Sequence, residues 1–298
     1  MQATIHNEYL TLTVDTHGAE AVSLKNAAGE ELLWQADPEV WKRHAPILFP
    51  WTGKLKDGSF THGGKTYKLE ANNGRNHLHG TFPRKIYDVK MFGDTLLMET
   101  ESPAGEDGFP GNLKVSVRYI LTPDNTLRMD YRVSSDADTI INLTNHTYFN
   151  LDGGGNVLGQ KLRIYASNYL EGNNETCPTG RILPVAGTPM DFRAGKPLGR
   201  DLDTGFYQTT MAGGGFDHCY VLDRPRGASQ SLCAWASSDK TGISMKMYTT
   251  QPGIQLYTGN FLQNCPSPGK GGVPMEKYGG FALETQHLSL IHISEPTR

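Results

Sequence analysis

Apolar and polar residues alternate with a period of two, and this pattern constrains the fold more than any other feature. Residues 113–119 place Leu, Val, Val and Tyr at every second position, and residues 127–133 repeat the pattern with Leu, Met, Tyr and Val. The segment 122–125 between them reads Thr-Pro-Asp-Asn, which favours a turn. Because a half-buried strand has this period, the sequence predicts an antiparallel hairpin over residues 113–133.

Similar alternation recurs elsewhere, while helical periodicity is scarce. The further strand-like stretches are residues 10–14, 87–91, 96–100 and 243–247. At most one helical turn is expected, over residues 39–43, directly after Pro38. The chain also has 34 glycines, and each glycine inside a helix costs about 1 kcal/mol relative to alanine. We therefore predict an all-β protein, built as a single large antiparallel β-sandwich with glycine-rich loops.

Composition and charge narrow the classes of function. Lys plus Arg number 28 and Asp plus Glu number 31, so the formal net charge is −3, which offers no basic excess for nucleic acid. No apolar run reaches the roughly 18 residues of a membrane span, and the first residues lack the segments of a secretory signal. The four cysteines form no CxxC pair. We therefore expect reduced thiols in a cytoplasmic protein without nucleic-acid or membrane partners.

The C-terminal segment from Leu288 to Arg298 reads LSLIHISEPTR. This string is the in-frame translation of a common transposase sequencing adapter. We therefore expect one domain over residues 1–287, truncated at its C-terminal end, and an adapter-derived segment outside the fold over residues 288–298. The opposing interpretation is an ordinary C-terminal strand.

Polar residues inside strand-like, apolar text are the first candidates for chemistry. His146 lies in the stretch INLTNHTYFNL, among three asparagines that strand interiors disfavour. It is either a hydrogen-bonded structural histidine or a general acid, since imidazole titrates near neutral pH. Glu284 follows Phe-Ala-Leu and precedes Thr-Gln, and it is either an outward-facing strand residue or a functional buried carboxylate.

Two histidines, His77 and His79, form a further candidate. On an extended segment they would face the same side and could bind a metal. Zinc normally takes three or four protein ligands, however, and no second clustered pair is present, so we expect no metal. Asp217 precedes His218, but without a GxSxG elbow this pair gives little support to acyl transfer.

Taken together, these segments resemble the aldose 1-epimerase (galactose mutarotase) family. The motifs, in chain order, are NHLHG, NLTNHTYFNL, PTGRILPVAGTPMDFR, GFDHCYVL, TTQPGIQLYTGN and LETQ, and they extend along nearly the whole chain. The resemblance implies a galactose mutarotase-like β-supersandwich with a sugar site on one sheet. It also implies interconversion of the α and β anomers of a free aldose, without metal or organic cofactor.

The resemblance also implies roles for individual residues. Glu284 matches the general base of the family and His146 its general acid, and His79 matches a second active-site histidine. Asp217 matches a carboxylate that binds sugar hydroxyls, and Gln255 a sugar-binding amide. For His79, both polarising the ring oxygen and orienting the sugar remain open.

Two departures from the family pattern bear on the substrate. Lys54, in PWTGKLKDGSF, stands where the family typically carries arginine, and this stretch is more similar to LacX-type relatives. Lysine keeps the charge but lacks the planar fork of arginine, so sugar recognition is expected to differ. Arg84 follows the altered HGTFPR segment and could meet a phosphate.

We therefore expect an isomerase that acts on free hexoses such as galactose or glucose, with a monosaccharide as its partner. Two alternatives remain open: a hexose-6-phosphate 1-epimerase on the same fold, and a non-catalytic carbohydrate-binding β-sandwich. The sequence does not choose between a monomer and a homodimer.

Overall fold

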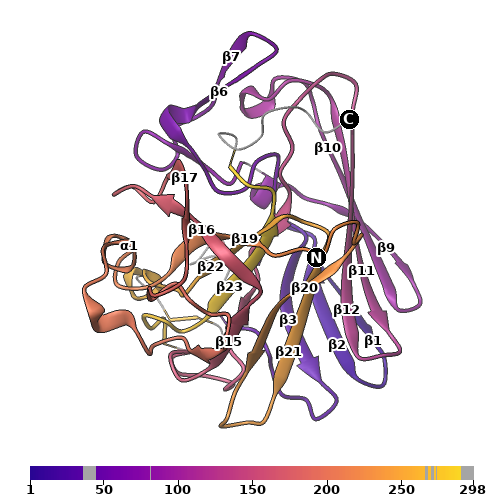
Figure 1. The fold of residues 1–298 in the computed structure, drawn as a ribbon. Helices are drawn as coiled ribbons and strands as arrows, with labels where there is room; N and C mark the ends of the chain where they lie inside the picture. The colour runs from indigo at the N-terminus through magenta and orange to yellow at the C-terminus, as the bar shows by residue number, and fades with distance from the viewer. Residues whose placement is uncertain (36–44, 81, 266–267, 270–271, 273, 290–298) are drawn as a thin grey trace. The chain divides into compact units, whose positions relative to one another are not determined.

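The structure is a computed structural model that describes residues 1–35, 45–80, 82–265, 268–269, 272 and 274–289. Its regular structure is nearly all antiparallel strand, with a five-residue helix α1 (Tyr207–Met211), so the predicted all-β class is confirmed (Figure 1). The helical turn expected at residues 39–43 and the segment 290–298 lie outside the described residues. None of the helices among those residues has the length and the apolar composition of a membrane span.

The chain divides into two compact units, of which the first comprises Met1–Glu31 and Lys42–His146. Its larger sheets have the strand orders β1-β2-β3 and β12-β11-β10-β9. Their strands are β1 (Gln2–His6), β2 (Leu10–Asp15), β3 (Glu20–Asn26), β9 (Asp88–Phe92), β10 (Thr95–Ser102), β11 (Leu113–Thr122) and β12 (Thr126–Ser135). The phenol of Tyr119 in β11 donates a buried 2.6 Å hydrogen bond to the Ala19 carbonyl, just before β3, and so joins the two sheets.

The predicted hairpin is confirmed as β11 and β12. Their antiparallel register runs from Leu113 opposite Ser135 to Thr122 opposite Thr126. Every second residue of β11, from Leu113 to Leu121, is buried. The turn contains Asn125 with φ 61°, a conformation that asparagine tolerates better than most residues. The alternating pattern therefore predicted the strands correctly, and the Thr-Pro-Asp-Asn segment predicted the turn.

The first unit also contains three two-stranded sheets. They pair β4 (Ile47–Leu48) with β13 (Thr144–Asn145), β5 (Lys54–Leu55) with β8 (His77–Leu78), and β6 (Ser59–His62) with β7 (Lys65–Lys68). Short 3-10 helices lie between strands of both units: η1 (Lys56–Gly58), η2 (Phe82–Arg84), η3 (Glu106–Gly108), η4 (Leu202–Thr204) and η5 (Leu262–Asn264).

The second unit comprises Leu32–Trp41 and Thr147–Arg298. Its sheets have the orders β14-β23-β22-β19-β16-β17 and β18-β15-β20-β21. The strands are β14 (Tyr148–Phe149), β15 (Lys161–Ile164), β16 (Ala166–Gly172), β17 (Pro178–Pro184), β18 (Lys196–Pro197), β19 (Asp217–Leu222), β20 (Ser231–Ser237), β21 (Ser244–Thr249), β22 (Gly253–Tyr257) and β23 (Phe281–Gln286). The predicted single domain over residues 1–287 stays a prediction.

One hydrophobic core joins the two sheets of the second unit. Leu162 and Ala234 enter it from the four-stranded sheet, and Ile254, Leu256 and Leu283 enter it from the six-stranded sheet. Because neighbouring residues on a strand point to opposite faces, the residues between these apolar ones lie on the other face of the six-stranded sheet. That face carries the polar residues described below.

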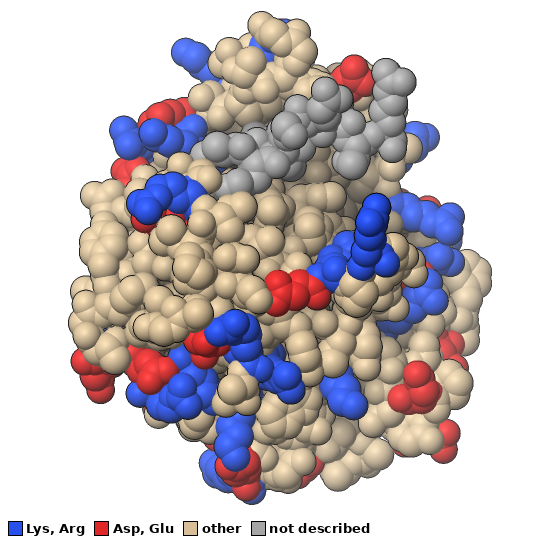
Figure 2. Space-filling model, in the orientation of Figure 1, with Lys and Arg blue, Asp and Glu red and all other residues tan. Residues whose placement is uncertain are grey.

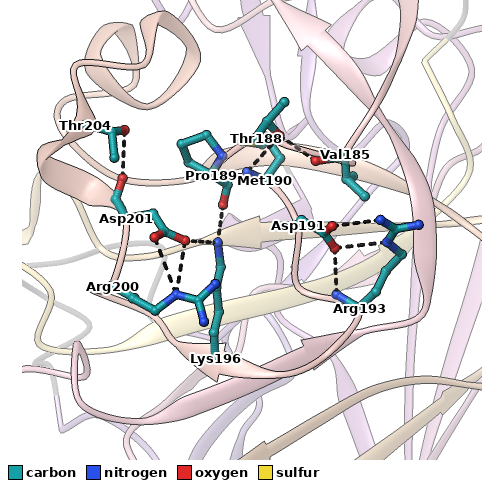
Figure 3. A network of polar contacts seen from close by, with 10 residues as sticks. All are labelled: Val185, Thr188, Pro189, Met190, Asp191, Arg193, Lys196, Arg200, Asp201 and Thr204. Atoms are coloured by element: carbon teal, nitrogen blue, oxygen red, sulfur yellow. Dashed lines mark hydrogen bonds and ion pairs between the residues drawn. The ribbon is translucent and has the colours of Figure 1, made fainter.

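The segment from β17 to α1, which includes β18 and η4, is held by a buried lysine in β18 (Figure 3). The Lys196 ammonium donates hydrogen bonds of 2.5 Å to the Pro189 carbonyl and to the Asp201 carboxylate, and it lies 4.5 Å from the ring centroid of Phe192. Burial lowers the pKa of Lys196, and Asp201 opposes that shift. Since a buried ammonium without partners would be costly, these contacts favour a single conformation of this segment.

Candidate active site

Three of the predicted site residues lie together on the six-stranded sheet of the second unit. In the strand register, Gln255 of β22 stands opposite Cys219 of β19 on one side and Glu284 of β23 on the other. Residues opposite each other in a ladder share a face, and Asp217 lies on the same face, two positions before Cys219. We call Asp217, Gln255 and Glu284 the carboxylate face.

Glu284 is buried, with 3% of its surface exposed. Burial raises its pKa well above the ordinary range, and the negative charge of Asp217 raises it further. A carboxylate in such an environment is a stronger base than an exposed one once it is ionised. The interpretation of Glu284 as an outward-facing, solvated strand residue is therefore wrong.

Gln255 and Asp217 are joined by a direct contact. The Gln255 Nε2 amide donates a 2.7 Å hydrogen bond to Oδ1 of Asp217. This bond fixes which end of the amide is the donor, because a carboxylate oxygen only accepts. Asp217 is partly exposed, so its carboxylate can also accept hydrogen bonds from hydroxyl groups of a ligand.

The two predicted active-site histidines lie together in the first unit, and we call them the histidine pair. The rings of His79 and His146 have centroids 5.4 Å apart and planes inclined at 81°. Both residues are buried. His146 follows β13, and its backbone N–H donates a 3.0 Å hydrogen bond to the Pro46 carbonyl, so its position depends on the chain that leads into β4.

The tautomer of His79 follows from its backbone contact. The Gly53 N–H donates a 3.2 Å hydrogen bond to Nδ1 of His79. Because Nδ1 accepts there, a neutral His79 carries its proton on Nε2. Its remaining ring nitrogen is then a donor, which suits contact with an oxygen atom.

The expected extended geometry from His77 to His79 is wrong. His79 has φ 67° and Gly80 has φ 66°, so the chain leaves the strand conformation directly after β8. His77 instead places its Nδ1 2.8 Å from the Glu70 carbonyl and packs its ring against Phe109. Burial lowers the pKa of His77, and its contacts are those of a structural residue.

Two basic residues, Lys54 and Arg84, are candidates for substrate contacts. Lys54 lies in β5 opposite Leu78, next to the glycine that contacts His79, and it is partly exposed. Arg84 is exposed at the end of η2 and interacts electrostatically with Asp107. The pKa of Asp107 is raised to about 6 by burial and by the charges of Glu106 and Glu70. The Asp107 carboxylate partly offsets the charge of Arg84, while Lys85, which forms a 2.6 Å ion pair with Glu106, adds a second cation to this cluster.

Two further features of the molecule bear on ligand binding: its potential metal ligands and the distribution of its surface charges. Among the described residues, no group of three or more His, Cys, Asp or Glu side chains is placed to hold a metal ion. On the face shown in Figure 2, basic and acidic side chains are interspersed, in keeping with a net charge of −3.

Sequence reasoning missed the partners that support the carboxylate face. The sequence shows His218 only as the neighbour of Asp217, yet its side chain is hydrogen-bonded to that of Gln208 in α1. Gln208 lies in a polar stretch with no distinguishing pattern, so no sequence signal points to this contact.

Comparison with known proteins gives the family. A family model described as aldose 1-epimerase matches residues 1–295. Galactose mutarotase from Sus scrofa is 40% identical over 239 residues, which cover 78% of this chain and 67% of that protein. Aldose 1-epimerase from Escherichia coli K12 is 33% identical over 299 residues, which cover 95% and 84% of the two chains.

A solved structure agrees with these sequence relationships. The crystal structure of an aldose epimerase homologue from C. elegans superposes with a TM-score of 0.85 at 26% identity, covering 96% of this chain and 90% of that chain. The predicted galactose mutarotase-like fold and the resemblance in the motifs are thereby confirmed. The chain belongs to the aldose 1-epimerase family.

Proposed function

We propose that this protein is an isomerase that interconverts the α and β anomers of free hexoses such as galactose and glucose. The observation that carries the proposal is Glu284, a buried carboxylate of raised pKa beside Asp217 and Gln255 on the polar face of a sheet. Relatives named galactose mutarotase and aldose 1-epimerase support the same activity.

The reaction needs one base and one acid. Glu284 removes the proton from the C1 hydroxyl while His146 donates a proton to the ring oxygen, so the C1–O5 bond breaks and an open-chain aldehyde forms. Rotation about the C1–C2 bond presents the other face of the aldehyde. The ring oxygen then attacks C1, with His146 now accepting a proton and Glu284 donating one. Each proton transfer contributes about 10²–10⁴-fold to the rate.

The remaining site residues bind and orient the sugar in this proposal. Asp217 accepts hydrogen bonds from sugar hydroxyls, and Gln255, held by Asp217, offers its amide oxygen as a further acceptor. His79 donates from Nε2 to a sugar oxygen, in keeping with the contact of its Nδ1 to Gly53. Lys54, the first residue of β5 and the neighbour of Gly53 in the chain, contributes a positive charge and hydrogen-bond donors.

We also place the protein in the cytoplasm, with a monosaccharide as its partner. Within the described residues none of the four cysteines forms a disulfide, and Cys177, Cys219 and Cys233 are buried. Thiols of this kind persist where the surroundings are reducing.

Polarimetry of freshly dissolved α-D-galactose tests the activity. Wild-type protein is expected to speed the approach to anomeric equilibrium, and Glu284→Ala or His146→Ala is expected to lower the rate by about 10²–10⁴-fold while the fold survives. Wild-type rates in both variants would contradict the assignment of base and acid.

Two further measurements distinguish the proposed activity from a sugar-phosphate epimerase and from a non-catalytic carbohydrate-binding protein. Turnover of glucose 6-phosphate in preference to galactose would favour the sugar-phosphate epimerase. Saturable galactose binding without any acceleration would favour a carbohydrate-binding protein and would overturn the proposed activity.

A further inference from the structure

A buried polar contact lies behind the carboxylate face and has no assigned role. His218 directly follows Asp217 in β19, so its side chain points to the opposite face of the sheet. It is 2% exposed and packs edge-on against Tyr169, with ring centroids 5.9 Å apart. Its hydrogen-bond partner is Gln208 of α1. We call these two side chains the Gln208–His218 bridge.

The contacts of Gln208 fix the orientation of its amide. Its Nε2 donates to the Gly172 carbonyl at 3.0 Å, and its Oε1 accepts from the Gly172 N–H at 2.9 Å. Oε1 is therefore an acceptor also toward His218 Nε2, which lies 3.0 Å away. Since Oε1 cannot donate, Nε2 of His218 must carry a proton.

The other ring nitrogen of His218 contacts Asp217. The backbone N–H of Asp217 donates a 3.1 Å hydrogen bond to Nδ1 of His218. The ring is therefore a neutral Nε2–H tautomer with both nitrogens satisfied. Burial lowers the pKa of His218 to about 3, so the ring keeps this form across the physiological range.

The sheet itself explains why Asp217 needs this partner. In the ladder between β19 and β16, residues 220–222 pair with Tyr169, Asn168 and Ala166, and the register shifts between Ala166 and Asn168. The ladder ends before Asp217, and at this position Nδ1 of His218 accepts the hydrogen bond from the Asp217 N–H. At its carboxylate, Asp217 is held by Gln255. Asp217 is therefore held at its backbone from one face of the sheet and at its side chain from the other.

We propose that Gln208 and His218 are positioning residues that fix Asp217 for sugar binding. This inference rests on the proposed function, because it takes Asp217 to be a sugar ligand. The bridge lies on the core side of the sheet, so it acts through Asp217 and not on the sugar. Its loss should weaken sugar binding and leave the proton transfers of Glu284 unchanged.

A double-mutant cycle tests the inference. His218→Phe keeps a ring of similar size and removes both hydrogen bonds, so it should raise the KM for galactose about 10-fold, with kcat and its pH profile nearly unchanged. In an Asp217→Ala background, the same substitution should change KM by less than about twofold. An equal effect in both backgrounds would show a general structural role and would overturn the proposal.

Two further variants separate positioning from loss of stability. His218→Asn keeps an acceptor near the Asp217 N–H, so it should restore most of the lost affinity. Thr209→Val removes a different hydrogen bond of α1, from the Thr209 hydroxyl to the carbonyl of Phe206 just before the helix, and should leave KM unchanged. A KM increase in Thr209→Val as large as that in His218→Phe would contradict the proposal.

Spectroscopy and calorimetry make the test independent of turnover. ¹⁵N NMR should show a neutral His218 with its proton on Nε2, and a proton on Nδ1 would overturn the inference. If wild-type protein binds galactose without accelerating anomer exchange, the proposed function fails by itself. The double-mutant cycle is then measured with galactose dissociation constants in place of KM values. The same outcomes support or contradict the positioning role of the Gln208–His218 bridge.

Discussion

The histidine pair and the carboxylate face are built on different kinds of backbone. His79 and His146 follow two-residue strands, and His79 has a positive φ. Asp217, Gln255 and Glu284 lie on three neighbouring strands of five or six residues in regular antiparallel register. One set depends on particular backbone conformations, and the other depends on strand alternation.

This difference in backbone predicts that the histidine pair and the carboxylate face respond differently to substitutions. A regular ladder places side chains by its period, so the carboxylate face should tolerate small backbone substitutions but respond to changes of charge. An irregular turn places a side chain through a few dihedral angles and close contacts, so the histidine pair should respond strongly to a change at a neighbouring glycine.

The largest expected effect tests whether the two sets serve one reaction. Glu284→Gln and His146→Asn should each lower the mutarotation rate by about 10²–10⁴-fold, and the double variant should be no more than about 10-fold slower than the slower single variant. Non-additivity is expected because acid and base act in the same proton-transfer step. Polarimetry measures all three.

Glu99→Gln is the control, because Glu99 forms an exposed ion pair with Lys90 and should keep the wild-type rate. If the losses of the two single variants multiply in the double variant, the two residues act independently, and the histidine pair and the carboxylate face do not share a step.

The next effect concerns the backbone of the histidine pair. Gly80 has φ 66°, and a Cβ there would overlap the carbonyl oxygen of Phe49. Gly80→Ala should lower the free energy of unfolding by about 3 kcal/mol or more and reduce activity through His79. Gly64→Ala is the matched control: its φ is 74° with open space around a Cβ, so it should cost only about 1 kcal/mol. Equal costs in denaturant unfolding would contradict the steric explanation.

A smaller effect concerns the charge of the carboxylate face. The pKa of Glu284 is raised in the folded protein, so its stabilising contribution is present below the unfolded pKa and is lost as the pH rises through the folded pKa. Glu284→Gln removes this loss. The variant should therefore have a higher Tm than the wild type at about pH 8, with a smaller difference at about pH 5. A difference that grows on acidification would mean that the pKa of Glu284 is lowered.

The smallest effect is expected for a glycine on the carboxylate face. Gly253 lies outside the positive-φ region, and a Cβ there would lie 3.0 Å from the Cys219 sulfur and 3.3 Å from the Gln286 carbonyl. Gly253→Ala should change the free energy of unfolding by about 1 kcal/mol or less and leave the rate within about threefold. A loss as large as that of Gly80→Ala would remove the contrast between the two sets.

The strands were predictable where one face is buried and the other is polar. β11 shows this clearly, because every second residue is in the core. The carboxylate face follows from the same rule once the register is known, but a single sequence does not state which strands pair. Asp217, Gln255 and Glu284 are far apart in the chain, and only the β19-β22-β23 order brings them together.

The histidine pair and the Gln208–His218 bridge show why the rest was not predictable. Alternation placed His77 and His79 on one side, but the positive φ of His79 separates them. That turn depends on the close approach of Gly80 to Phe49, a contact distant in sequence. The bridge likewise depends on a long-range contact between Gln208 and the end of β16.

Exchange NMR of galactose at anomeric equilibrium is the most direct test of acid–base anomer interconversion. At equilibrium, only an active catalyst moves magnetisation between the α and β anomeric protons on the timescale of the measurement. Exchange cross-peaks are expected with wild-type protein and none with Glu284→Gln at the same concentration. Cross-peaks of equal intensity with both proteins would contradict it.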